Sequence, residues 1–296
     1  MKKLTIVIPT FNRKDSLVHL LETLQKQGSE GTDLTIAVVV DGSTDGTQEA
    51  IRSLFPQVAI IEGDGQWWWT KSVNEGCKWA LKNDADAVLL LNDDICLDED
   101  YLRNLLNAVE KEPQAIIGSI NITEEKERKI FFSGAPRMNW WAGKIRRYHP
   151  FLAPYNEKLS GLHKTAVLPG RGMYIPAHVF EKVGYFDQEF LPQYKADYDF
   201  VLRAAKQGIP AFISWDAIIY TQTGKTGPGA TFTQQSLSRF SKSLFHNRSR
   251  TNLRQNFTYY LRHFPRALIP IFPLTSLIIL ARQFFLFRRE RKYRSS

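Results

Sequence analysis

Short apolar runs, typical of buried strands, alternate with segments of helical spacing over the first 120 residues. The run Leu4–Pro9 is followed by Ser16–Gln27, where apolar residues stand at positions 17, 20, 21 and 24. Strands that alternate with helices form right-handed βαβ units, whose strands are mostly parallel and buried. The sequence therefore predicts an α/β protein with a mostly parallel central sheet flanked by helices. Further strands are predicted at 34–40, 58–61, 87–91 and 115–120, and further helices at 45–54, 71–83 and 100–112.

The second half of the chain has a less regular pattern. Residues 121–165 are rich in aromatic and basic side chains. They are followed by a predicted loop at 168–176, a helix from Ala177, a helix near 198–207 and a strand at 211–215. Beyond Gly229 the sequence becomes basic and aromatic, which predicts a main domain over 1–228 and a basic amphipathic helical tail over 229–296.

The composition excludes several classes of protein. Apolar residues make up 43% and charged residues 23% of the 296 residues, which is ordinary for a globular protein and excludes wholesale disorder. Cys77 and Cys96 form no C-x-x-C pair, which argues against a zinc site or a disulfide scaffold and favours a reducing cytoplasm. The apolar run Leu4–Pro9 is too short for the core of a signal peptide.

Charge is divided unevenly between the main domain and the tail. Residues 239–296 hold thirteen Lys or Arg and one Glu, a net charge of +12; since the whole chain carries +9, residues 1–238 carry −3. A basic tail usually meets nucleic acid, anionic lipid or an acidic partner. No recognised nucleic-acid motif accompanies the charge, so we expect no nucleic-acid binding.

The tail contains a mostly apolar stretch of twenty residues, Leu268–Phe287. That length would allow a membrane span. Pro270 and Pro273 interrupt its first turns, however, and Arg282 would cost about 2.5–3.5 kcal/mol at the centre of a bilayer. A helix in the membrane interface, with its basic residues on anionic headgroups, fits better. Packing in a homodimer is the alternative role for this tail.

Polar residues follow four of the predicted strands at the point where each strand ends. They are the segments 9–13 (PTFNR), 41–45 (DGSTD), 63–66 (GDGQ) and 92–94 (NDD). The carboxyl ends of parallel strands meet at one edge of a sheet, where open α/β sheets bind their ligands. Each segment alone could be a simple turn, because Asp, Asn, Gly and Ser favour turns. Their convergence predicts a binding site.

The loop after the first strand argues against the two commonest nucleotide folds. A dinucleotide-binding fold needs G-x-G-x-x-G there, but residues 9–13 contain no glycine. Gly224–Thr226 has the last three residues of a P-loop without its upstream glycine or its strand and helix. The adjacent acids Asp93 and Asp94 instead suggest a divalent cation that bridges to a diphosphate. A helix-capping cluster is the alternative, since acids follow at 98 and 100.

Five segments follow one another along the chain: IVIPTFNR, VVVDGSTDGT, LLLNDDI, LPGRGMYIP and FDQEFLPQYKADYDFVLRAAKQG. Together, and in this order, they resemble glycosyltransferase family 2. The resemblance covers about residues 3–222, and the stretch DGQWWWTKSVNEG with the NDD motif is most similar to bacterial rhamnosyltransferase-type members. It implies the GT-A fold, with a nucleotide-binding half over about 1–120, an acceptor half over 121–228 and inverting, metal-dependent transfer.

The resemblance places a donor nucleotide along the polar strand ends. It assigns Asp41 to the edge of a uracil or thymine base, and Asp94 to a Mn²⁺ or Mg²⁺ ion. The family's first metal-motif acid is Asn92 here. Lys71 is assigned to a phosphate, with a solvated lysine as the alternative. The predicted donor residues are Pro9, Thr10, Asn12, Asp41, Asp45, Gly65, Trp69, Lys71, Asn74 and Asp93.

The segment 194–199 (YKADYD) matches the part of the family that carries the general base. Asp197 keeps that position, whereas the family's preceding Glu is Ala196 here. Inverting transfer needs one carboxylate to take the acceptor hydroxyl's proton. Asp199 is the alternative base, with Arg203 one helical turn away as a plain ion-pair partner. The predicted acceptor residues are Gly170, Arg171, Gly172 and Asp199, with a tight turn as the alternative reading of 170–172.

Two further features are open to two interpretations each. Tryptophans 67–69 could stack on a sugar or base, or fill the core, and we expect one in each place. The family often has a histidine metal ligand after its last core strand. Residues 219–223, at the end of the last predicted strand, contain no histidine, and Gln222 is the candidate replacement.

We therefore expect an inverting glycosyltransferase on the inner, cytoplasmic face of the cell membrane. It would move a sugar from a UDP- or dTDP-linked donor to a lipid-linked or polysaccharide acceptor in cell-surface glycan synthesis. A non-catalytic nucleotide-sugar-binding or scaffold protein is one alternative, because Ala196 replaces an acid. A nucleotidyltransferase is the other, although that class favours a glycine-rich basic loop after the first strand.

Overall fold

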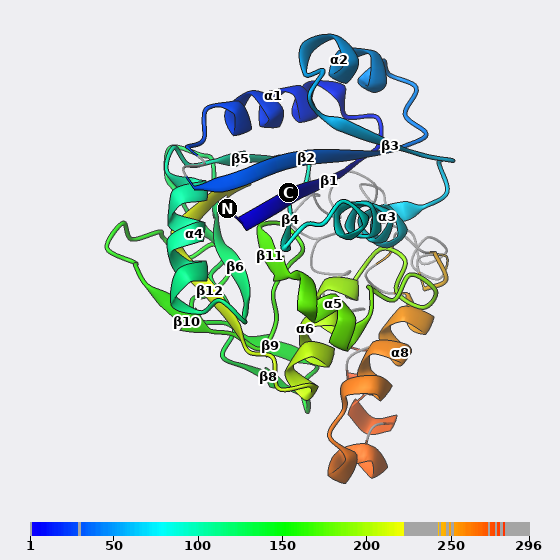
Figure 1. The fold of residues 1–296 in the computed structure, drawn as a ribbon. Coiled ribbons are helices and arrows are strands. Elements are labelled where there is room, and N and C mark those ends of the chain that lie inside the picture. Colours follow the sequence, from blue (N-terminus) through cyan, green and yellow to red (C-terminus); the bar gives the residue numbers. More distant parts are fainter. Residues whose placement is uncertain are drawn as a thin grey trace, which may run out of the picture.

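A ten-stranded sheet, with helices on both faces, forms the centre of the computed structural model (Figure 1). The strand order is β10-β12-β6-β11-β4-β1-β2-β3, with β5 added against β12 and β7 against β6. The structure describes residues 2–28, 31–221, 242, 244–246, 249, 252–271, 273–275, 277, 278 and 281.

The first half of the sheet is parallel, as the sequence pattern predicts. Strand β1 lies between β2 and β4, and β3 pairs with the outer side of β2, all in parallel register. One helix connects each strand to the next. The elements are β1 (Lys2–Thr10), α1 (Lys14–Gln25), β2 (Thr32–Asp41), α2 (Thr47–Leu54), β3 (Ala59–Gly63), α3 (Trp68–Lys82) and β4 (Ala87–Leu90).

The second half of the sheet is mixed. Strand β6 runs parallel to β12, while β11 runs antiparallel between β4 and β6. The predicted loop at 168–176 is therefore wrong in part: its end is a buried strand, because the apolar residues from Met173 on fill the space between β4 and β6. The elements are β5 (Ile95–Leu97), α4 (Tyr101–Lys111), β6 (Ile116–Thr123), β7 (Ile130–Phe132), β10 (Leu162–Lys164), β11 (Met173–Pro176), α5 (Ala177–Val183), α6 (Ala196–Lys206) and β12 (Ala211–Thr221).

The alternation of side chains along each strand divides the core between the two faces. Ile6 and Ile8 of β1 pack with apolar residues of α1, α2 and α4 on one face. Val7 and Val39 pack on the other face, against α3 and together with α5 and α6. Gly76 lets α3 approach the sheet closely, since a Cβ there would lie 2.3 Å from Val7 Cγ1. A small hairpin, β8 (Arg137–Asn139) and β9 (Lys144–Arg146), stands apart.

Part of the predicted tail packs on the main domain. Helix α8 (Leu253–His263) lies beside α6, and its Tyr259 and Tyr260 belong to the same buried cluster as α5 and α6 (Figure 1). A short 3₁₀ helix, η1 (Arg266–Ile271), follows it. None of the helices in the described residues is long and apolar enough to cross a membrane. Half of the predicted interfacial stretch 268–287 lies outside the described residues.

Candidate donor and catalytic site

The acid pair after β4 lies at the carboxyl edge of the sheet, held by the first loop. Asp93 and Asp94 are both buried. Arg13 Nη1 donates to Asp94 Oδ2 at 2.7 Å and to Asp93 Oδ1 at 3.1 Å, and Thr10 Oγ1 donates to Asp93 Oδ2 at 2.8 Å. The sequence interpretation quoted Arg13 without giving it a role. Arg13 directly follows Asn12 and lies between the end of β1 and the start of α1, and this position could have identified it as a residue of the site.

The acid pair suits a divalent cation. Burial and the neighbouring charge of Asp94 together raise the pKa of Asp93 to about 6, although the charge of Arg13 and the hydrogen bonds from Thr10 and Arg13 oppose the rise. Asp94 Oδ1 is buried and has no hydrogen-bond partner among the described residues. A buried carboxylate oxygen is costly to leave unpaired. In the described part of the chain no three His, Cys, Asp or Glu side chains gather to hold a metal alone. A hard cation would thus need oxygens from a diphosphate and water as well.

Asp41 ties the end of β2 to the start of α3. Its carboxylate accepts the backbone N–H groups of Gly65 at 2.8 Å, Trp67 at 3.0 Å and Trp68 at 3.2 Å. The first N–H groups of a helix have no partner within the helix, so Asp41 caps α3 from another strand. This cap explains why α3 begins at Trp68 rather than at the predicted residue 71.

The loop after β1 is fixed to the loop after β2 by side-chain bonds. Asn12 Oδ1 accepts the backbone N–H of Thr44 at 2.7 Å. Asp45 accepts the backbone N–H groups of Lys14 and Thr47 and the Thr47 hydroxyl. Burial works against a low pKa at Asp45, but these hydrogen bonds outweigh it and lower the pKa. Asn12 and Asp45 therefore shape the predicted donor edge, beside Pro9 and Thr10 at the end of β1.

Two predicted donor residues point elsewhere in the described structure. Asn74 is buried within α3 and bonds to the backbone of Phe186 and the side chain of Gln188, so it anchors the 186–193 segment. The Lys71 ammonium lies over the Trp67 ring, 4.9 Å from its centre. Neither side chain contacts the acid pair.

Trp69 links the acid motif to residues 170–172, the predicted acceptor loop, which is called the acceptor loop below. Its indole Nε1 donates to Asn92 Oδ1 at 3.2 Å. Its ring lies against Gly170, where a Cβ would come within 2.3 Å of Trp69 Cζ2. All three tryptophans at 67–69 are half-buried, so the expectation that one of them is fully buried in the core is wrong.

Asp197 stands in the first turn of α6, next to that acceptor loop. Its Oδ2 accepts the backbone N–H of Gly170 at 3.1 Å, and its Oδ1 accepts that of Tyr198 at 2.8 Å. Burial raises the pKa of Asp197 to about 6, although these hydrogen bonds and Arg171 oppose the rise. The side chain is half-buried. A carboxylate with such a pKa is ionised at neutral pH and still a competent proton acceptor.

Asp199, the other candidate on α6, faces away from the acceptor loop and is fully buried. Its carboxylate accepts from Arg203 Nε at 2.8 Å, Arg262 Nη1 at 2.9 Å and His263 Nε2 at 2.7 Å. The bond to Arg203 is the ion pair that the sequence predicts. Burial alone would raise its pKa, but these partners lower the pKa of Asp199 to about 2. It is thus a structural carboxylate, which corrects its prediction as an acceptor residue. The sequence interpretation missed Arg262 and His263, because they lie in the tail.

The rest of the acceptor loop is braced by the sheet. Arg171 Nη1 donates to Thr221 Oγ1 at 3.1 Å, and its guanidinium lies 5.4 Å from the centre of the Phe131 ring. Gly172 has φ +75°, and a Cβ there would lie 2.3 Å from Ile219 Cδ1. Only glycine meets both constraints. The candidate metal ligand Gln222 lies outside the described residues.

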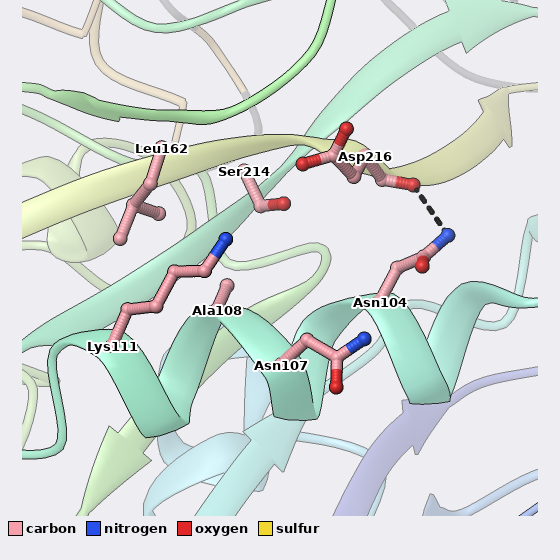
Figure 2. Close-up of a pocket in the computed structure, with 7 residues that line it drawn as sticks. All are labelled: Asn104, Asn107, Ala108, Lys111, Leu162, Ser214 and Asp216. Carbon is pink, nitrogen blue, oxygen red and sulfur yellow. Dashed lines mark hydrogen bonds between the residues drawn. The ribbon is translucent and has the colours of Figure 1, made fainter.

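A pocket of about 220 Å³ lies between α4, β10 and β12, and none of the predicted site residues lines it (Figure 2). Asn104 and Lys111 reach into it from α4, and Asp216 closes it through a 3.0 Å bond from Asn104 Nδ2 to its backbone oxygen (Figure 2). The pocket is distinct from the strand-end site.

The contact between Trp69 and Gly170 gives a first prediction. We expect Gly170→Ala to lower activity, because the added methyl group would push the indole away from the loop that bonds Asp197. Overpacking of this kind costs about 1–3 kcal/mol. Thermal unfolding and donor turnover measure the two effects. Gly28→Ala is the control for added bulk, because a Cβ there meets nothing within 4 Å and the φ of Gly28 is not in the left-handed region.

Comparison with known proteins decides the family. Residues 5–181 match the model of glycosyl transferase family 2. The chain belongs to this family. The family match covers the polar strand ends, the acid pair and the acceptor loop, and it ends within α5, before Asp197. No curated protein matches the sequence.

Several solved structures share the family-2 chain's fold. GalNAc-T7 with UDP, GalNAc and Mn²⁺ aligns at TM-score 0.61 and 12% identity, over 75% of this chain and 44% of that one. The mannosyltransferase PcManGT from Pyrobaculum calidifontis, in complex with GDP-Man and Mn²⁺, aligns at TM-score 0.56 and 17% identity, over 93% and 68%. TarS of S. aureus aligns at TM-score 0.55 and 16% identity, over 90% and 44%. The chain thus spans less than half of two of these proteins, and at such identities the likeness shows the GT-A fold alone.

Proposed function

We propose that the protein transfers a sugar, with inversion, from a nucleoside-diphosphate donor to an acceptor hydroxyl at the strand-end site. The observation that carries the proposal is the chain of contacts from Asn92 through Trp69 and Gly170 to Asp197. It joins the motif suited to a metal and diphosphate to a carboxylate suited to a base. The solved neighbours that hold UDP or GDP-Man with Mn²⁺ support the same substrate class.

Asp197 acts as the general base. The acceptor hydroxyl gives its proton to the carboxylate while its oxygen bonds the sugar's anomeric carbon, and the bond from that carbon to the diphosphate oxygen breaks. Attack from the side opposite the leaving group inverts the anomeric carbon. The two backbone N–H bonds orient the carboxylate for this step.

Asp94, beside Asp93, would hold a divalent cation, Mn²⁺ or Mg²⁺. The unpartnered Asp94 Oδ1 supports this assignment. When bound there, such an ion would supply positive charge to balance that of the leaving diphosphate. Arg13 keeps the two carboxylates together, and its guanidinium adds positive charge beside the phosphates. In this proposal the base of the donor is uracil or thymine, and the donor also contacts Asn12, Asp41, Gly65 and Trp69.

The proposal predicts an acid limit on the rate. Because protonation of Asp197 removes the base, turnover of donor falls as pH drops below about 6. The pH dependence of nucleotide release from UDP- and dTDP-sugars measures this limit. A rate that stays constant from pH 8 to pH 5 contradicts the assignment of Asp197. A protein that binds these donors without any turnover is instead the non-catalytic alternative.

We further propose that the acceptor is lipid-linked or a growing polysaccharide in cell-surface glycan synthesis, met at the inner membrane face. The net charge of +12 in residues 239–296 supports attraction to anionic lipid. Phe257 and Leu261 are 55% and 49% exposed on α8, one helical turn apart. The buried face of α8 belongs to the core, so a chain without the tail would lose part of that core, and the full chain is the right material for a test.

Vesicle binding tests the membrane assignment in the full chain. We expect co-sedimentation with phosphatidylglycerol vesicles that weakens with salt, because each basic residue near the surface adds about 1 kcal/mol. The double substitution Phe257→Ser and Leu261→Ser should reduce the binding that remains at high salt. Leu54→Ser, at a residue 56% exposed on α2, is the control. A chain that stays in the supernatant at low salt, and scatters light as a dimer, supports homodimer packing instead.

A further inference from the structure

We infer that helix α8 belongs to the catalytic unit, with Arg262 and His263 as positioning residues for Asp197. The inference rests on the proposed role of Asp197 as the base. Asp197 lies in the first turn of α6, and α8 contacts the residues on both sides of it. These contacts join a helix from the tail to the two residues that flank the proposed base by two positions on either side.

On one side, α8 holds Lys195, the residue that precedes α6. Lys195 has φ +68°, a strained conformation for a lysine. Its ammonium donates to Asn256 Oδ1 and lies over the rings of Tyr259 and Tyr260, at 5.2 and 4.8 Å from their centres. These α8 contacts keep the strained backbone in place where α6 begins.

On the other side, α8 holds Asp199. Arg262 and His263 donate to the same oxygen, Asp199 Oδ1, at 2.9 and 2.7 Å. His263 Nδ1 is buried and has no partner among the described residues. Because Asp199 is ionised, Nε2 must carry the proton in this bond, and burial lowers the pKa of His263 despite the carboxylate. The ring thus serves as a neutral donor to a buried carboxylate.

Arg262 also extends the connection to the donor side. Its Nη2 donates to Asp187 Oδ2 at 2.6 Å. The segment after Asp187 binds α3, where Thr70 Oγ1 donates to the backbone oxygen of Leu191 at 2.6 Å and Gln193 Oε1 accepts the Trp69 N–H at 3.2 Å. Arg262 therefore contacts both α6, which carries the proposed base, and the segment 187–193, which binds the backbone of Trp69.

Loss of these contacts should misplace the base without removing the donor site. A misplacement of about 1 Å can cost on the order of 10²-fold in rate. We expect Arg262→Gln and His263→Leu to lower kcat for nucleotide release from UDP- or dTDP-sugars about tenfold or more, with little change in KM for the donor. His263→Gln, whose amide can donate to Asp199 as Nε2–H does, should recover most of kcat. Arg266→Gln removes an exposed charge from the same tail and is the matched control.

Hydrogen exchange in the full chain provides a readout that needs no donor. The backbone N–H groups of residues 196–200 should exchange faster in Arg262→Gln and His263→Leu, and at the parent rate in His263→Gln and Arg266→Gln. If the backbone N–H groups of residues 196–200 exchange at the parent rate in both Arg262→Gln and His263→Leu, the inference is overturned. Faster exchange with unchanged kcat, or a parallel loss in His263→Gln, also overturns it, since α8 would then only stabilise the fold. A parent protein that turns over no donor contradicts the proposed function, and the exchange result alone then decides whether α8 holds the turn.

Discussion

Replacing Asp197 by Asn should leave donor binding intact and lower kcat by about 10²–10⁴-fold, the range that general-base catalysis supplies. The amide oxygen of Asn can still accept the Gly170 N–H, so the loop should keep its place. Burial disfavours the charged carboxylate, which is why the pKa of Asp197 is raised to about 6. A neutral side chain avoids that cost, but its NH₂ group cannot accept the Tyr198 N–H, so the thermal midpoint at pH 7 should stay close to that of the parent protein.

Steady-state turnover, donor titration and thermal unfolding on the same preparations separate these effects. Glu189→Gln removes an exposed carboxylate from the segment before α6 and should change none of them. If Asp197→Asn keeps nearly the full rate, the base is another group. A fall in rate that comes with a lower midpoint would point to a folding defect instead.

Replacing Asp94 by Asn should abolish the Mn²⁺-dependent part of donor binding. The substitution keeps the side chain's volume in a buried place and removes the charge that a cation needs. Arg13 keeps its bond to Asp93, so the loop after β1 should hold. Calorimetric titration of a UDP- or dTDP-sugar, with and without Mn²⁺, measures the loss.

Asp64→Asn is the matched control, because Asp64 is an exposed acid at the same edge of the sheet. It should bind donor and Mn²⁺ as the parent does. An Asp94→Asn protein that also binds both normally shows that the acid pair is not the metal site.

The fold of the first 120 residues could be predicted closely from the sequence. The spacing of apolar residues and the polar residues at strand ends are local signals in the sequence. Each strand and helix predicted there is found within a few residues of its predicted place. The strand β11 escaped prediction, because its four residues follow a glycine-rich turn and read as part of a loop. Its position depends on partners far away in the chain, on β4 and β6.

The sequence could predict which residues gather at the strand ends, but not which partners each of them binds. Motif order identified Asp94 and Asp197 as candidates. The partner of an acid depends on packing that no single motif encodes. Asp41 accepts backbone N–H groups at the start of α3, and Asp199 accepts from side chains of α8. The tail's charge suggested a separate element, whereas its buried face makes part of it a component of the core.

A thermal-shift panel of UDP-, dTDP- and GDP-sugars, with and without Mn²⁺, tests the central claim most directly. A ligand present at a hundred times its Kd adds about 2.7 kcal/mol to the stability of the folded chain. We predict that at least one UDP- or dTDP-sugar raises the midpoint of the full-length protein in the presence of Mn²⁺, and that the rise disappears without the metal or in Asp94→Asn. If no nucleotide sugar shifts the midpoint, or if the shift is the same without metal and in Asp94→Asn, the strand-end site is not a metal-dependent donor site.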